Sequence, residues 1–215
     1  MRHVIKRNLE KVKEDIAHYQ PNIIAVTKYF DEYAMTEAYY AGLRDFGESR
    51  VIEALQKIER LEMQVREHSK FHLIGHLQTN KVKKAVSAFD LIQSVDSVQL
   101  AQKISEEAQK ISKIQDILLQ LNISGEEQKF GFSTEELLEA LPKIQKLPGI
   151  NVKGIMTMAP LGASEAELET LFAQAARIKE LCNLQEISMG MSQDYKTAAR
   201  MGSTMLRIGR KLFEE

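Results

Sequence analysis

Two spacings of hydrophobic residues alternate along the chain, and each predicts a different element. Over residues 5–19 the apolar positions recur at steps of three and four, as on one face of a helix, and Pro21 ends the pattern. Residues 23–26 then form a short run of consecutive apolar side chains. Because both faces of such a run are apolar, it suits a strand of a parallel sheet that helices cover. The chain therefore opens with an amphipathic helix followed by a buried strand.

This alternation continues to the end of the sequence. Helical spacing is expected over residues 51–65, 100–111, 138–144, 168–178 and 193–201. Further strands are expected at residues 45–47, 71–75, 91–95, 117–123, 152–156, 186–189 and 205–208. Strands that alternate with helices pair in parallel through right-handed crossovers, and about eight such units in one compact chain favour a closed barrel over an open sheet. The predicted fold is α/β, a single barrel of the (β/α)8 or TIM type.

One domain over residues 1–215 is expected, because no linker rich in proline, glycine or serine and no low-complexity tract divides the chain. The sequence leaves almost no room for a helix after the eighth strand. The extra N-terminal helix, which precedes the first strand, is expected to cover the gap that this leaves in the outer ring of helices.

Composition narrows the classes of partner. A hydrophobic share of 44% suits a protein with a real core, and 29 basic residues against 30 acidic ones leave a net charge of −1. That charge gives no basic footprint for nucleic acid or an anionic membrane, and no apolar run approaches the roughly 20 residues that cross a bilayer. The N-terminal residues lack the apolar block of a secretory signal, and the lone Cys182 excludes an internal disulfide. We therefore expect a soluble, cytoplasmic protein that binds neither nucleic acid nor a membrane.

Lys28 is the first candidate for chemistry. In barrels of this type the functional face lies at the C-terminal ends of the strands, and Thr27 and Lys28 directly follow the first apolar run. A lysine that points inward at the barrel mouth is partly desolvated, which lowers the pKa of its amine and frees it for Schiff-base chemistry. Position alone favours the other interpretation, in which the side chain extends into solvent at a strand end.

An anion site is predicted after the seventh strand. Ser192 is a candidate N-cap for the helical stretch over residues 193–201, with Asp194 in its first turn and Gly202 at its C′ position. The free N–H groups of a helix that begins there point at the barrel mouth, where barrels commonly bind phosphate. Taken alone, Ser192 is equally well explained as a structural cap.

The segment after the eighth strand strengthens this site. Arg207 supplies a fixed cation, and Gly209 permits close approach of the backbone to a bound anion. A lysine amine on the first strand and a phosphate-binding loop after the last two strands form a more specific pair than either feature alone. The pair fits pyridoxal 5′-phosphate, which offers an aldehyde to the amine and a phosphate to the loop.

Seven stretches of the sequence carry a family resemblance. They are residues 25–28 (AVTK), 46–51 (FGESRV), 71–81 (FHLIGHLQTNK), 122–127 (NISGEE), 154–160 (GIMTMAP), 188–192 (SMGMS) and 207–209 (RIG). In these stretches the chain resembles the pyridoxal phosphate homeostasis protein family, whose fold is similar to the N-terminal barrel domain of alanine racemase. The stretches occur in the family order and span nearly the whole chain, so chance is a poor explanation.

The resemblance implies the roles of the site residues. It makes Lys28 the lysine that forms the internal Schiff base with pyridoxal phosphate, and Ser192, with the backbone near Gly190 and Gly209, the phosphate binder. By similarity to the racemase barrel, Arg207 is the partner of the pyridine nitrogen. A guanidinium cannot accept a proton, so it would keep that nitrogen unprotonated and make the ring a weak electron sink. The other cofactor-binding residues expected from the resemblance are Ser49, Met156, Ser188 and Ile208.

Two positions depart from the family pattern. Ser49 and Gln193 both stand where the family usually has asparagine. The first change alters the contacts near the cofactor and the lysine, whereas the second lies outside the helix cap and matters less.

Other polar residues suggest weaker alternatives. His72 and His76 are four residues apart, but on a strand that spacing separates them by ~13 Å, so a shared metal ion is not expected. The polar segment 125–132 is either a lid over the mouth or, as is more common, a solvated loop.

Four further side chains are given structural roles. Packing in the core is favoured over cofactor contact for Met156 and Met158. Glu48 and Asp194 are expected to be supporting and capping groups rather than general acids or bases.

The sequence favours a cofactor carrier over an enzyme. Racemisation needs two bases, one on each face of the substrate α-carbon. In the racemases the base opposite the lysine comes from a β-rich second domain, which this chain is expected to lack. A Schiff base open to solvent is poor for turnover and suited to storing a reactive aldehyde.

The favoured function is therefore a role in intracellular vitamin B6 homeostasis and supply, without substantial catalysis. Its expected partners are pyridoxal phosphate and the apo-enzymes that receive it, and the expected state is a monomer or weak dimer. Two alternatives stay open. One is a pyridoxal-phosphate-dependent amino-acid racemase with Tyr29 or Tyr195 as second base, and the other is a phospho-metabolite barrel in which Lys28 is only a charge.

Overall fold

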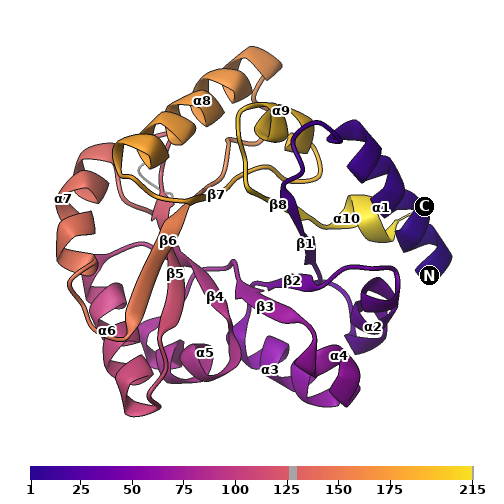
Figure 1. Ribbon diagram of the computed structural model, residues 1–215, viewed down its shortest axis with the longest axis horizontal. Helices are drawn as coiled ribbons and strands as arrows, with labels where there is room; N and C mark the ends of the chain where they lie inside the picture. The colour runs from indigo at the N-terminus through magenta and orange to yellow at the C-terminus, as the bar shows by residue number, and fades with distance from the viewer. Residues whose placement is uncertain (126–129, 215) are drawn as a thin grey trace.

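Eight parallel strands close into a barrel, with each strand hydrogen-bonded to its neighbours in chain order and β8 returning to β1 (Figure 1). The computed structural model describes residues 1–125 and 130–214. The strands are β1 (Asn22–Val26), β2 (Asp45–Glu48), β3 (Lys70–Leu73), β4 (Leu91–Val95), β5 (Gln115–Leu121), β6 (Ile150–Thr157), β7 (Glu186–Ser188) and β8 (Met205–Ile208). The predicted TIM-type fold and all of its expected strands are confirmed.

The helices form a ring outside the strands (Figure 1). They are α1 (Arg2–Asp15), α2 (Glu32–Tyr40), α3 (Val51–Arg60), α4 (Met63–Glu67), the 3-10 helix η1 (Thr79–Lys81), α5 (Val82–Ala88), α6 (Val98–Lys110), α7 (Thr134–Ile144), α8 (Glu165–Leu181), α9 (Tyr195–Arg200) and α10 (Arg210–Phe213). The apolar side chains between this ring and the strands make up the main core.

Three features of the helices differ from the sequence-based expectation. The helix expected over residues 51–65 is interrupted at Leu61, which takes an extended conformation and is itself buried. Helix α5 was not expected from the sequence, because its seven residues are too few to display a helical spacing of apolar side chains. Helix α2 was not expected either. Its apolar spacing is obscured because the charged Glu37 is among its buried residues, and the Glu37 carboxylate pairs with Arg2 at 2.6 Å.

The barrel closes between the first and last strands. Ile24 pairs with Arg207 and Ala25 with Ile208 across the β1–β8 seam. Outside this seam α1 lies beside the four-residue α10 (Figure 1), and the Asn8 amide donates to the main-chain oxygens of Leu212 and Glu214. The expectation that the N-terminal helix covers the gap after the eighth strand is confirmed.

A small apolar cluster fills part of the barrel interior. Leu91, Leu118 and Met156 pack together there, with Met205 against them. Because β4 and β8 lie on opposite sides of the ring, contact between their side chains places this cluster inside the barrel. The packing role expected for Met156 is confirmed, while its contact with a cofactor stays a prediction. Over the residues that the structure describes, no helix combines the length and apolar character of a membrane span.

Candidate functional site

The sequence-predicted site residues follow the strands at one rim of the barrel. Because all strands run parallel, their C-terminal ends share one face. Lys28 lies after β1 and Gly209 after β8, which are neighbours across the seam. A Cβ built on Gly209 would lie 3.7 Å from the main-chain oxygen of Val26, so the end of β1 and the segment after β8 are in contact.

Lys28 sits in a tight turn at this rim. The amide of Phe30 donates to the oxygen of Thr27 at 2.9 Å, which closes the turn around the lysine. The Lys28 side chain is exposed, and its Nζ lies 5.0 Å from the centroid of the Tyr29 ring. The interpretation favoured by position alone, a side chain that extends into solvent at the strand end, is the one that the structure shows. Lys28 and Ser49 share a small cavity of about 200 Å³.

A buried ion pair supports the turn from behind. Lys57, on α3, donates from its ammonium to the main-chain oxygens of Thr27 at 2.8 Å and Phe30 at 2.9 Å, and forms a short ion pair with Glu48. Glu48 also accepts from the hydroxyl of Thr27 at 2.7 Å. These bonds use all three N–H groups of the Lys57 ammonium, so the ends of the turn on both sides of Lys28 are fixed.

The expected supporting role of Glu48 is confirmed by these contacts. Lys57 was missed by sequence reasoning. It lies in the middle of an amphipathic helix, where a lysine gives no signal that separates it from the solvated lysines of the other helices.

The loops after β7 and β8 touch each other at the same rim. The hydroxyl of Ser192 accepts a hydrogen bond from the Gly209 amide at 3.2 Å. The Arg207 amide donates to the oxygen of Gly190 at 2.9 Å. Gly190 has φ +94°, and a Cβ there would lie 2.5 Å from the Cβ of Ala198, so only glycine fits. The structure thus brings together the predicted phosphate-binding residues.

The predicted cap at Ser192 is wrong. Residues 192–194 form a turn, and α9 begins at Tyr195 with Asp194 as its N-cap residue. The carboxylate of Asp194 accepts from the Met191 amide, so it stabilises the turn and leaves the Ser192 hydroxyl to Gly209. Burial raises the pKa of Asp194, against the effects of the Met191 N–H and the positive charge of Arg207.

Gly202 has φ +89° and directly follows Met201, the C-cap residue of α9, as expected for a C′ glycine. Gly209 is less constrained than expected. A Cβ there would meet Val26 only at ordinary contact distances, so its close approach to a bound anion stays a prediction.

Arg207 is a fixed cation inside the barrel, below this rim. Its side chain is 4% exposed and donates to the hydroxyl of Ser188 at 2.7 Å and to the main-chain oxygen of Thr157 at 2.8 Å. Burial lowers the pKa of Arg207 to about 10, against the opposing charge of Asp194. The guanidinium therefore keeps its proton at neutral pH, as expected from the sequence. Ile208 is fully buried beside it.

The two histidines lie in separate environments. His72 Nε2 is 2.9 Å from an oxygen of Asp45 inside the barrel. His76 pairs with Asp96 at 3.2 Å, and its ring stacks on Phe130 at 3.9 Å between centroids. Among residues 1–125 and 130–214, no three His, Cys, Asp or Glu side chains gather as metal ligands would.

The predicted lid segment is described only in part, because residues 126–129 lie outside the described residues. Beside its described end, a cavity of about 330 Å³ is lined by Phe130, Met158, Leu161 and Met191, among others. Met158 is 38% exposed here, so the core packing expected for it is wrong. Strand β6 ends at Thr157, so Met158 lies just beyond the barrel wall.

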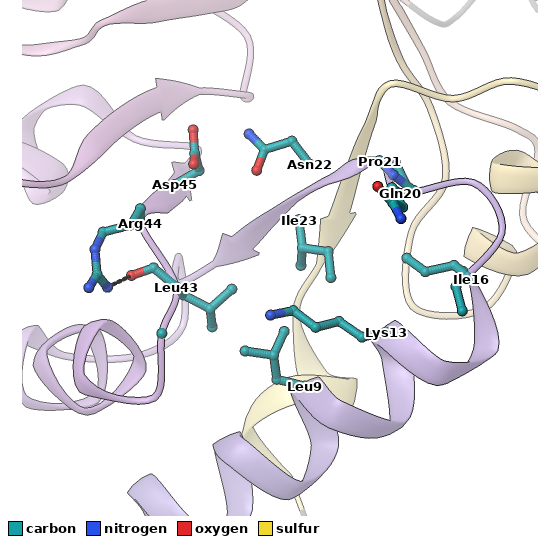
Figure 2. A pocket seen from close by; sticks show the side chains of 12 residues that line it. Leu9, Lys13, Ile16, Gln20, Pro21, Asn22, Ile23, Leu43, Arg44 and Asp45 are labelled. Carbon is teal, nitrogen blue, oxygen red and sulfur yellow. Dashed lines mark hydrogen bonds between the residues drawn. The ribbon is translucent and has the colours of Figure 1, made fainter.

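A third cavity, of about 590 Å³, lies at the opposite end of the barrel, and Figure 2 shows the side chains that line it. Its wall includes Leu9 and Lys13 of α1, Asn22 at the start of β1 and Asp45 at the start of β2. It is therefore separate from the rim that carries the predicted site.

Comparison with known proteins identifies relatives over the whole barrel. The model of the family described as "Alanine racemase, N-terminal domain" matches residues 2–214. A pyridoxal phosphate homeostasis protein of Synechocystis is 39% identical over 208 residues, covering 93% of this chain and 94% of that protein. The human protein of the same name is 31% identical over 226 residues, covering 98% of this chain and 82% of its own length.

Solved structures give the same picture. PipY of Synechococcus elongatus, in a structure with PLP bound, superposes with a TM-score of 0.88 at 35% identity and covers 98% of this chain and 100% of its own. Alanine racemase of Clostridium difficile superposes with a TM-score of 0.78 at 14% identity, covering 98% of this chain and 56% of its own. The second likeness concerns the fold alone.

Proposed function

Because the chain belongs to the family of pyridoxal phosphate homeostasis proteins, built on the alanine racemase N-terminal domain, we propose that it binds pyridoxal 5′-phosphate at the rim described above. In this proposal the cofactor is held as a reversible Schiff base on Lys28, and the protein acts in vitamin B6 homeostasis and supply without substantial catalysis. The observation that carries the proposal is the hydrogen bond between Ser192 and Gly209 beside the β1–β8 seam. It brings the two loops expected to bind phosphate next to the strand that leads to the lysine.

The donor groups at this rim fit the cofactor. A phosphate needs several hydrogen-bond donors. The Ser192 hydroxyl, which accepts from Gly209 and keeps its own proton to donate, and the first N–H groups of α10 are the proposed donors. Arg207 makes two hydrogen bonds with protein acceptors in the described chain, which leaves three of its five N–H groups for a pyridine nitrogen. A donor-only, protonated partner keeps that nitrogen unprotonated.

Lys28 supplies the covalent contact. When bound, the cofactor contributes an aldehyde. The neutral Lys28 amine would form a carbon–nitrogen double bond with the aldehyde carbon and release one water. Because this side chain is exposed, water also reaches it for the reverse reaction, which suits storage and release.

Several contacts support a carrier rather than a racemase. The hydroxyl of Tyr195 makes a short hydrogen bond to Asp15 on α1, and burial together with that carboxylate raises the pKa of Tyr195 strongly. A phenol held in this way does not abstract a proton at the barrel mouth. Tyr29 lies beside Lys28 in the same exposed turn, so it does not face the lysine from across a bound substrate. Apo-enzymes are the proposed recipients, the cytoplasm the proposed location, and a monomer or weak dimer the proposed state.

The proposal is tested by loading the purified protein with pyridoxal phosphate. Wild-type protein should show an absorption band of bound cofactor and, after borohydride reduction, one adduct on Lys28 by mass spectrometry. Lys28→Ala should lose both, whereas Lys146→Ala, at another exposed lysine in a turn, should keep both. Rapid exchange of the alanine α-proton in deuterated water by the loaded protein would contradict the carrier role, and a missing band would favour a phospho-metabolite barrel.

A further inference from the structure

A chain of polar side chains crosses the interior of the barrel. It runs from Asp45 on β2 through His72 on β3, Gln93 on β4 and Ser188 on β7 to Arg207 on β8. The four successive hydrogen bonds measure 2.9, 3.0, 2.7 and 2.7 Å. Between its ends the side chains are fully or almost fully buried. Polar groups in such an interior are costly unless each has a partner, and here each has one.

Chemistry fixes the direction of every bond in this chain. Arg207 has donors only, so the Ser188 oxygen accepts from it and the Ser188 O–H donates to Gln93 Oε1. The amide nitrogen of Gln93 then faces His72 Nδ1, which must accept. His72 is left with its proton on Nε2, where it donates to Asp45.

The opposite end of the chain requires the same direction. An ionised carboxylate only accepts, so Asp45 also demands a donor at His72 Nε2. Burial tends to raise the pKa of Asp45, but the hydrogen bond from His72, with smaller contributions from Asn22 and the charge of Lys70, outweighs it, and the pKa lies below its usual value. Two independent end groups thus select one proton arrangement.

We propose that Asp45, His72, Gln93 and Ser188 are positioning residues that hold the Arg207 guanidinium in one orientation at the cofactor site. The inference rests on the proposed function for its assignment of Arg207 to the pyridine nitrogen. The guanidinium is anchored by Ser188 on one nitrogen and by Thr157 on the other, so its remaining N–H groups point in a fixed direction. Loss of the Ser188 anchor allows the guanidinium to rotate about the Thr157 bond.

The chain also links the two ends of the barrel. Asp45 lines the cavity at the far end, where Figure 2 shows its carboxylate beside Asn22. Its side chain is 15% exposed, whereas Gln93 and Ser188 are fully buried. The hydrogen bonds are thus continuous from the far cavity to Arg207.

The first test needs no cofactor. Nitrogen-15 NMR of the wild-type protein without cofactor should show His72 as the neutral tautomer with its proton on Nε2. A proton on Nδ1, or on both nitrogens at neutral pH, would overturn the proposed direction of the chain. This result is decided whether or not the protein binds pyridoxal phosphate.

The second test uses the loaded protein and a matched pair of buried glutamines. Gln93→Met breaks the chain of hydrogen bonds in its middle. Gln115→Met changes another fully buried glutamine, whose side-chain amide donates to the main-chain oxygens of Asp90 and Asp116 instead. Gln93→Met should shift the absorption band of the bound cofactor and weaken its binding by roughly fivefold, as for the loss of one neutral hydrogen bond. Gln115→Met should do neither, and the borohydride adduct on Lys28 should form in both.

Ser188 provides the check that does not depend on how well Gln93→Met folds. Ser188→Ala should reproduce the spectral shift, and Ser188→Thr, which keeps the hydroxyl, should restore the wild-type band. If wild-type protein binds the cofactor and all these variants share its spectrum and affinity, the positioning role is overturned and the proposed function stands. If wild-type protein binds no cofactor, the proposed function fails instead.

Discussion

The ammonium of Lys57 donates a 2.8 Å hydrogen bond to the main-chain oxygen of Thr27, the residue directly before Lys28. The same ammonium pairs with Glu48, and the two side chains are 12% and 2% exposed. The proposed cofactor lysine is thus free to move while the turn that carries it is held rigidly from behind. This separation suits a site in which the side chain must find, hold and release an aldehyde.

Removing Lys57 should destabilise the whole barrel. Lys57→Met leaves the Glu48 carboxylate buried without its charged partner, which costs about 3–5 kcal/mol of unfolding free energy. The exposed pair of Lys103 and Glu106 provides the control, because solvent screens it and Lys103→Met should change the unfolding free energy little. Urea unfolding followed by circular dichroism measures both, and equal losses would show that the Lys57 ion pair has no special weight.

Gly190 and Gly202 separate packing from backbone strain. Both have φ near +90°, but an added Cβ would collide with Ala198 and Leu206 at Gly190 and would meet nothing at Gly202. Gly202→Ala should therefore cost about 1 kcal/mol from strain alone. Gly190→Ala should cost about 1–3 kcal/mol more because of overpacking. The midpoints of thermal unfolding test this order, and a Gly202→Ala variant as unstable as Gly190→Ala would contradict it.

The pH dependence of stability should reveal the contact between Asp45 and His72. The folded-state pKa of Asp45 lies below its unfolded value of about 3.9, so its contribution is present above that pH and is lost as the pH falls through the folded pKa. His72→Phe removes the hydrogen bond that lowers this pKa most, so burial, which raises the pKa, is opposed only by the smaller effects of Asn22 and Lys70. Destabilisation by acid should then begin at a higher pH than in the wild type.

Urea midpoints between about pH 3 and 6 measure this shift. His76→Phe changes a histidine that pairs with Asp96 instead, so the urea midpoint should fall with decreasing pH over the same range as in the wild type. If His72→Phe also loses stability over the same pH range as the wild type, the contact between His72 and Asp45 does not set the pKa of Asp45.

Arg207 and Ser192 should affect different parts of a bound cofactor. Arg207→Gln removes the cation expected at the pyridine nitrogen, so the absorption band and its pH dependence should change more than affinity for the phosphate. Ser192→Ala removes a hydroxyl at the phosphate loop, so affinity should fall roughly tenfold while the band keeps its position. Spectral titration with pyridoxal phosphate measures both effects, and the reverse pattern would exchange the two assignments.

The sequence predicts the barrel well where a strand is a continuous apolar run. Residues 23–26 show this: neither face is polar, and the chain continues directly into the turn of Lys28. The site is predicted less completely. Ser192 is a residue type that favours the N-cap position, yet residues 192–194 form a turn and α9 begins only after Asp194. The Asp194 carboxylate accepts from the Met191 amide within that turn.

The polar chain inside the barrel leaves almost no signal in the sequence. Gln93 and Ser188 look like interruptions of apolar strands, and their partnership depends on which strands face each other across the closed ring. Lys57 is similar, since its acceptors Thr27 and Phe30 lie on a turn far away in the sequence. Pairings of this kind follow from topology and not from spacing.

The pairing of β1 with β8 also sets the point during synthesis at which the proposed cofactor site can form. Lys28 emerges from the ribosome long before Ser192, Arg207 and Gly209, which lie far later in the chain. A nascent chain thus carries the proposed cofactor lysine long before the loops proposed to bind phosphate exist, and long-range closure of this kind is slow. Capture of the aldehyde should accordingly be a late event that marks a completed barrel, and incomplete chains should not trap it.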